Sequence, residues 1–189
     1  EAVGWVTARP IRKVGDPLED DSKLGAIINE AQEQKILGYI QAGQVAGTTV
    51  CMGGGKVATE KGRFLEVTVL DHVPADCSVA KEEVFGPVLS IIRFRDKEQA
   101  IQIANSTVYG LSASVWTRDL DTAIWMSRKI EAGTVWINNF MSGYPEVPFG
   151  GFRQSGQGRE LGRFSIDEFT ELKSVLIHLG PAGEGWVGA

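Results

Sequence analysis

The fold class follows from one stretch of the chain, VLSIIRFRDKEQAIQIANSTVYGLSASVWTRDLDTAIWMSRKIEAGTVWIN, residues 88–138. Three strand-like apolar runs lie at 88–94, 111–117 and 133–138. Between them are two amphipathic runs that begin after Asp96 and after Asp119 or Asp121, and aspartate is a favoured helix N-cap. Strands that are apolar throughout and are joined by helices are typical of right-handed βαβ units in a buried parallel sheet. The sequence therefore predicts an α/β fold.

The flanks of this stretch add further elements. A helix is predicted with Asn29 as its N-cap and Gly43 as its end, and two β-rich runs at 48–52 and 64–70 predict strands. The segment 139–162 is a long loop rich in glycine and proline, and loops this long are often functional. A short helix and a strand at 171–179 should follow it. The opening ten residues are interpreted as the tail of a helix that Pro10 interrupts.

Composition excludes several classes of protein. The chain has 189 residues, of which 43% are hydrophobic and 23% charged, and its net charge is −5 with scattered basic residues. We therefore expect a globular domain that binds neither nucleic acid nor a membrane. The N-terminus lacks the features of a signal peptide, so a cytoplasmic location is expected. Two cysteines without CxxC spacing and two histidines support neither a disulfide framework nor a zinc site.

The stretch KEEVFGPV, residues 81–88, places two adjacent acids, Glu82 and Glu83, before a strand. One interpretation is structural, because acids at such a position are usually solvated or cap a turn. The other is that one carboxylate accepts hydrogen bonds from the vicinal hydroxyls of a nucleotide sugar, while Phe85 supplies a flat apolar wall. A second motif, PFGGFRQSGQGREL at 148–161, has four glycines that permit close backbone approach.

Together with TVYGLSASVWT and AGTVWINN, these motifs resemble the aldehyde dehydrogenase superfamily in their order and intervals. The resemblance covers nearly the whole chain and implies the parallel βαβ sheet of that family's catalytic domain. It further implies that Glu83 binds the nicotinamide ribose of NAD or NADP and that Phe85 lies beside the nicotinamide ring. Glu82 would be structural, and Gln32 and Lys35 would approach the cofactor from the side.

The resemblance also places the loop after 133–138 at the aldehyde tunnel. The candidate substrate contacts are Asn139, Phe140, Tyr144, Pro145, Glu146 and Phe149. Loop packing is the alternative role for the aromatic residues among them. The stretch PEVPFGGFRQSG resembles the branch that handles betaine aldehyde and aminoaldehydes, and Glu146 could attract such a cationic substrate.

The catalytic parts of such an enzyme are missing from this sequence. In the family, the nucleophilic cysteine, the general base and the oxyanion donor belong to a GQxC stretch, an ELGGK stretch and an upstream asparagine, and none of them is present. Cys51 and Cys77 match no such motif and are interpreted as packing residues. No catalytic residue is therefore assigned, and the chain by itself is expected to be inactive and to hold no cofactor.

By resemblance, residues 1–170 are the C-terminal part of the catalytic domain, 171–180 the oligomerisation strand and 181–189 a tail. The intact enzyme would oxidise an aldehyde to a carboxylic acid as a homo-oligomer, a dimer or a tetramer. The alternative is a noncatalytic short form that acts as an interaction module, pairing its last strand with full-length subunits.

Overall fold

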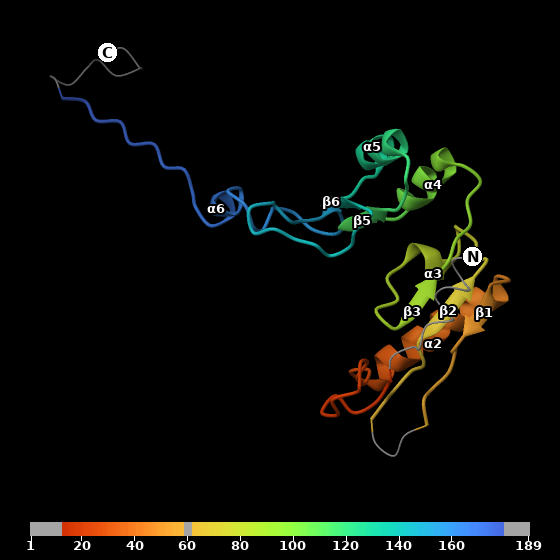
Figure 1. Ribbon diagram of the computed structural model, residues 1–189. Coiled ribbons are helices and arrows are strands. Elements are labelled where there is room, and N and C mark those ends of the chain that lie inside the picture. Colours follow the sequence, from red (N-terminus) through yellow and green to blue (C-terminus); the bar gives the residue numbers. More distant parts are fainter. Residues whose placement is uncertain (1–12, 59–61, 180–189) are drawn as a thin grey trace, which may run out of the picture.

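The computed structural model describes residues 13–58 and 62–179, and Figure 1 shows how their elements are arranged. The strands of the described chain are β1 (Thr49–Met52), β2 (Thr68–Asp71), β3 (Val88–Ser90), β4 (Tyr109–Gly110), β5 (Ser112–Val115), β6 (Thr134–Ile137) and β7 (Phe152–Arg153). Its helices are α2 (Glu30–Val45), α3 (Ser78–Lys81), α4 (Lys97–Ala104), α5 (Leu120–Lys129) and α6 (Ser165–Glu168). The predicted helix tail at 1–10 and the predicted tail at 181–189 lie outside the described residues.

The first sheet has the order β1-β2-β3. Its central strand β2 is buried along its whole length and pairs with β1 antiparallel and with β3 parallel. The strand expected over 64–70 therefore exists, but it begins only at Thr68. Two apolar clusters pack on this sheet, one around Ile36 and Leu65 and one around Leu70 and Val79. These clusters form the core between α2, α3 and the sheet.

Helix α2 starts as predicted and ends later than predicted. The side chain of Asn29 accepts a hydrogen bond from the Gln32 amide at 2.9 Å, which makes it the N-cap. The helix continues through Gly43 to Val45, and Gly43 serves close packing instead, since a Cβ there would come within 3.2 Å of Thr48 Oγ1. The turn that follows uses Gly47 instead, in the left-handed conformation at φ +92°.

The α/β fold class is confirmed, although the pairing of one strand differs from the prediction. Strands β5 and β6 are parallel and are joined by α5, whose N-cap is Asp119, so this part is the βαβ unit that was expected. Strand β3 was expected in the same sheet but pairs with β2, with Val69 opposite Leu89. The physical reason is that buried β2 needs a hydrogen-bonding neighbour at each edge, and β3 fills the edge that β1 leaves open.

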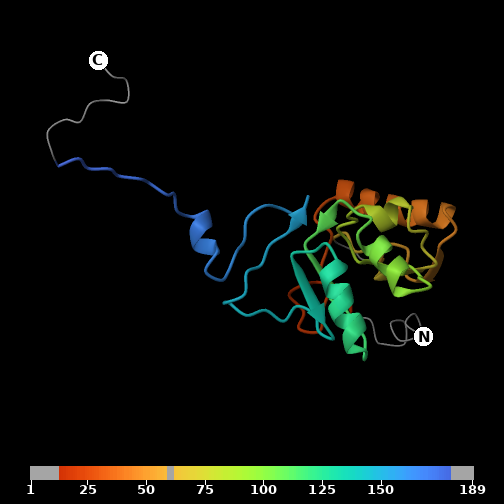
Figure 2. The same cartoon turned by 90° about the horizontal axis from the view of Figure 1, so that it is seen from above.

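The C-terminal part contains a short ribbon and an extended segment. Strand β7, inside the predicted loop, pairs antiparallel with β4. Residues 171–179 form no strand, contrary to the prediction, and Leu176 is 92% exposed. Figures 1 and 2 show this segment running away from the rest of the described chain, so it meets no strand edge with which it could pair. In the ranges 13–58 and 62–179, no helix is long and apolar enough to cross a membrane.

Candidate nucleotide site

The site is built on the turn between α3 and β3, which carries the two adjacent acids. Helix α3 ends at Lys81, and Glu82 is its C-cap in extended conformation, at φ −111° and ψ 158°. Further along the turn, Phe85 has a left-handed backbone with φ +52°. A phenylalanine in this region is strained unless its surroundings hold it there.

Helix α2 provides that support. The side-chain amide of Gln32 donates to the carbonyl oxygens of Val84 and Phe85, each at 3.1 Å. One helical turn further on, Ile36 is fully buried, and Gly86 packs directly against it. Two hydrogen bonds and a close packing contact thus fasten the turn to one face of α2.

The same face of α2 also carries Tyr39, whose hydroxyl donates to Glu82 Oε2 at 2.7 Å. The accepting carboxylate raises the pKa of Tyr39 above its usual 10.0. Glu83, by contrast, makes no hydrogen bond or ion pair within the part of the chain that the structure describes, and its side chain is exposed. Two neighbouring residues of the same type therefore differ in whether the carboxylate has a hydrogen-bond partner.

Both acids line a cavity of ≈ 690 Å³. Part of the lining is the end of α3 with the acids, and much of the rest comes from β4, β5 and the segment before β6. Its lining residues are Ala80, Lys81, Glu82, Glu83, Ala104, Thr107, Tyr109, Gly110, Leu111, Ser112, Ala113, Ile130, Glu131, Ala132, Gln154 and Ser155. Phe85 is not among them, and this residue is 75% exposed. The free carboxylate and the exposed ring thus lie two residues apart, on a turn that α2 holds.

Gln32 and Lys35, which were both predicted to approach a cofactor, have different surroundings in the structure. The amide nitrogen of Gln32 is occupied by the two carbonyls of the turn. The Lys35 side chain is exposed, with Nζ 5.8 Å from the centroid of the Tyr39 ring. Gln32 supports the turn, whereas Lys35 lies near the group that holds Glu82.

The predicted substrate residues do not join this cavity. Asn139 accepts from Ser114 Oγ through its backbone carbonyl at 2.6 Å, and Phe140 meets the Trp136 ring edge-on at 5.6 Å. Tyr144 and Glu146 are exposed.

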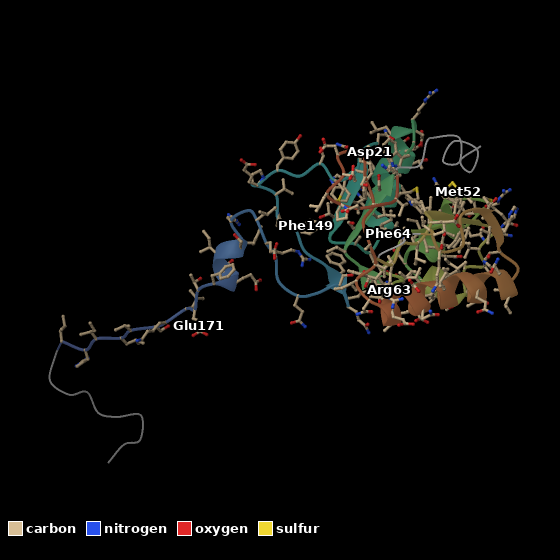
Figure 3. All side chains as sticks on the ribbon, turned by 90° about the horizontal axis from the view of Figure 1, so that it is seen from below. Asp21, Met52, Arg63, Phe64, Phe149 and Glu171 are labelled. Atoms are coloured by element: carbon tan, nitrogen blue, oxygen red, sulfur yellow. The ribbon has the colours of Figure 1, made fainter. Side chains whose placement is uncertain are left out.

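Phe149 is separate from the other loop residues. It lines a second cavity of ≈ 330 Å³, together with Arg159 and Phe169. Figure 3 shows Phe149 on the loop that leads out of the packed part around Phe64, with Glu171 farther along the same segment.

The surroundings of the two cysteines and the distribution of possible metal ligands bear on whether this chain could carry thiol or metal chemistry. Cys77 packs against the cluster around Leu70, in agreement with its interpretation as a packing residue, and Cys51 donates only to the Thr49 carbonyl, at 3.8 Å. No group of three or more His, Cys, Asp or Glu side chains that could hold a metal occurs in ranges 13–58 and 62–179.

Tyr39 was not among the predicted site residues. Residues 32, 36 and 39 share one helix face by their spacing, but no local pattern names the partner of that face.

Comparison with known proteins identifies the family of this chain. A model described as "Aldehyde dehydrogenase family" matches residues 6–175. An aldehyde dehydrogenase of Emericella nidulans is 46% identical over 170 residues, which are 90% of this chain and 34% of that protein. Human retinaldehyde dehydrogenase 3 is 44% identical over 89% of this chain and 33% of its own length.

Solved structures of similar proteins give the same result. The P. syringae indole-3-acetaldehyde dehydrogenase AldA, in complex with NAD+, is 43% identical with a TM-score of 0.84, over 89% of this chain and 34% of that one. A betaine aldehyde dehydrogenase of Staphylococcus aureus, also with NAD+, is 33% identical with a TM-score of 0.84, over 94% and 37%. The chain spans about a third of the length of the curated relatives that it matches. Since the family model matches most of the sequence, this chain belongs to the aldehyde dehydrogenase family.

Proposed function

We propose that this chain supplies one wall of the nicotinamide-nucleotide site of an NAD(P)-dependent aldehyde dehydrogenase, which oxidises an aldehyde to a carboxylic acid. The observation that carries the proposal is that the two adjacent acids, Glu82 and Glu83, have different hydrogen-bond partners. Glu83 has a free carboxylate at the edge of a large cavity, while Tyr39 holds Glu82. A free carboxylate on a supported turn is suited to accept hydrogen bonds from two neighbouring hydroxyls.

The residues present fit such a nucleotide. Glu83 would accept from both hydroxyls of the nicotinamide ribose, and the exposed ring of Phe85 offers a flat apolar surface for the nicotinamide. Gln32 would act by keeping Phe85 in its left-handed conformation, and the Lys35 ammonium would approach from the side. The bound nucleotide supplies the hydride acceptor, and we propose NAD rather than NADP because the similar solved structures were determined with NAD+.

The other parts of the reaction would come from outside this sequence. It contains no GQxC or ELGGK stretch to provide a thiolate and a general base. We therefore assign residues 1–170 to the C-terminal part of a catalytic domain and propose that the chain alone does not turn over aldehydes. An intact enzyme of this kind would pair through residues 171–180 as a homo-oligomer.

For the substrate we propose betaine aldehyde or an aminoaldehyde. Glu146 is exposed on the loop that also carries Asn139, Phe140 and Tyr144, so a carboxylate is available to a cationic substrate. Measured in the complete gene product, kcat/KM for betaine aldehyde should fall on Glu146→Gln, while that for an uncharged aldehyde should not. An equal fall for both aldehydes would contradict the role of Glu146.

A noncatalytic interaction module is the second candidate. It is favoured by the exposed apolar side chains of Leu172, Val175, Leu176, Ile177 and Leu179. If the extended segment pairs with a second subunit, light scattering should show a stable dimer of the 189-residue chain, and Leu176→Asp should dissociate it. A monomer at high concentration would exclude this function.

The nucleotide site is tested by titrating the 189-residue chain with excess NAD+ and following the backbone amide resonances of the turn, because one wall of the site alone should bind the nucleotide too weakly to retain it. We expect the resonances of Val84, Phe85 and Gly86 to shift. Glu83→Gln should weaken binding about tenfold to a hundredfold, since a hydrogen bond to a charged group contributes about 1.5–3 kcal/mol. Glu98→Gln, which removes an exposed acid from the first turn of α4, is the matched control and should bind like the original chain. Shifts elsewhere with none at the turn would refute the site.

A further inference from the structure

We infer that Tyr39 is a positioning residue that gives the two adjacent acids different roles, holding Glu82 so that Glu83 alone receives the ribose hydroxyls. The inference deepens the proposed function and rests on it for the identity of the ligand. The hydrogen bond itself, from the Tyr39 hydroxyl to Glu82 Oε2 at 2.7 Å, is a property of the chain without any ligand.

The backbone alone separates the two acids only in part. Extended backbone at Glu82 turns successive side chains to opposite sides of the chain. Glu82 nevertheless lines the same cavity as Glu83, so its flexible side chain is within reach of that space. A second contact is needed to fix its direction, and the Tyr39 hydroxyl provides it.

Tyr39 is well placed for this role. Its ring packs against the buried cluster of Leu70, Val73 and Val79, and tyrosine has few rotatable bonds to order. The Lys35 ammonium lies 5.8 Å from the ring centroid on the same helix face. The hydroxyl is therefore presented by a rigid ring, in contrast to the ammonium at the end of a flexible lysine side chain.

A released Glu82 would harm nucleotide binding in two ways. It would bring a second negative charge to a cavity that receives a ligand with an anionic pyrophosphate, and like charges repel. It would also compete with Glu83 for the same hydroxyl donors. The loss should therefore depend on the charge of Glu82 and not only on the missing tyrosine hydroxyl.

The experiment uses Tyr39→Phe, which keeps the ring and its packing, together with Glu82→Gln and the double variant. In the 189-residue chain, Tyr39→Phe should shift the NMR resonance of the Glu82 carboxylate carbon, while that of the Glu98 carboxylate stays in place. NAD+ affinity, measured by the amide shifts of the turn, should fall about threefold to tenfold in Tyr39→Phe, the range expected for one partly exposed charge-assisted hydrogen bond. Adding Glu82→Gln should restore most of that affinity.

The outcomes separate the inference from the proposed function. If Tyr39→Phe leaves the Glu82 resonance unchanged, the inference is overturned whatever the ligand. If NAD+ affinity falls and Glu82→Gln does not restore it, Tyr39 has only a structural role and the inference is again overturned. If the Glu82 resonance shifts while the original chain does not bind NAD+, the proposed function fails, and the assignment of Glu83 as the ribose acid fails with it.

Discussion

The glycine of the KEEVFGP turn offers a quantitative test of how α2 supports the site. A Cβ at Gly86 would lie 2.6 Å from Ile36 Cδ1, 2.8 Å from Cγ1 and 3.2 Å from Cγ2. All three distances are shorter than an ordinary van der Waals contact of about 3.5–4.0 Å between carbon atoms. Ile36 is 0% exposed and packed among Ile40 and Leu65, so it cannot move into solvent to make room.

Gly86→Ala should therefore behave as an overpacked core substitution. Such changes cost about 1–3 kcal/mol. With a urea m value of about 2 kcal/mol/M for a small domain, the unfolding midpoint should fall by roughly 0.5–1.5 M. The assay is urea unfolding of the 189-residue chain, followed by circular dichroism.

Two controls make this test specific. Gly38→Ala is the same chemical change within α2, at a position where a Cβ meets nothing within 4 Å, and it should stabilise the chain by about 0.5–1 kcal/mol. Ile36→Val removes the Cδ1 methyl, so it should recover part of the loss when combined with Gly86→Ala. A Gly86→Ala midpoint equal to that of the original chain, or strictly additive effects in the double variant, would refute the packing of the turn on α2.

Three further outcomes are expected. Gly133→Ala should prevent folding of the β5–β6 region, because its Cβ would overlap the Gly150 carbonyl oxygen. The control Gly143→Ala, whose Cβ meets nothing within 4 Å, should leave the circular dichroism spectrum unchanged. A Gly133→Ala chain that folds normally would contradict this contact. The hydrogen bond from Arg93 lowers the pKa of Asp71 below 3.8, so its stabilisation is present above that pH and is lost as the pH falls through the lower folded value. The urea midpoint should drop on acidification in this range, and it should drop less steeply in Arg93→Gln. Equal slopes of urea midpoint against pH in the two chains would argue against the Asp71–Arg93 ion pair. Glu82→Gln should lower the pKa of Tyr39 toward 10.0 in a tyrosine NMR titration, and an unchanged pKa would mean that the hydroxyl does not donate to Glu82 in solution.

Features of this chain that depend on residues close together in the sequence were predictable. The N-caps Asn29, Asp96 and Asp119 were predictable because a cap bonds to an amide only three residues away. The parallel βαβ unit of β5 and β6 followed from apolar runs joined by a helix. The family followed from long motifs in a fixed order, and the position of the acid pair before a strand was read directly from KEEVFGPV.

Contacts between groups far apart in the chain were not predictable and became visible in the folded structure. Strand β3 pairs with β2 rather than with β5. The side-chain amide of Gln32 donates hydrogen bonds to the carbonyl oxygens of Val84 and Phe85, more than fifty residues away. Tyr39 distinguishes Glu82 from Glu83, which the sequence shows only as two equal acids. The physical reason is that periodicity specifies which face a side chain occupies, whereas its partner depends on how separate elements pack, and packing is a property of the whole fold.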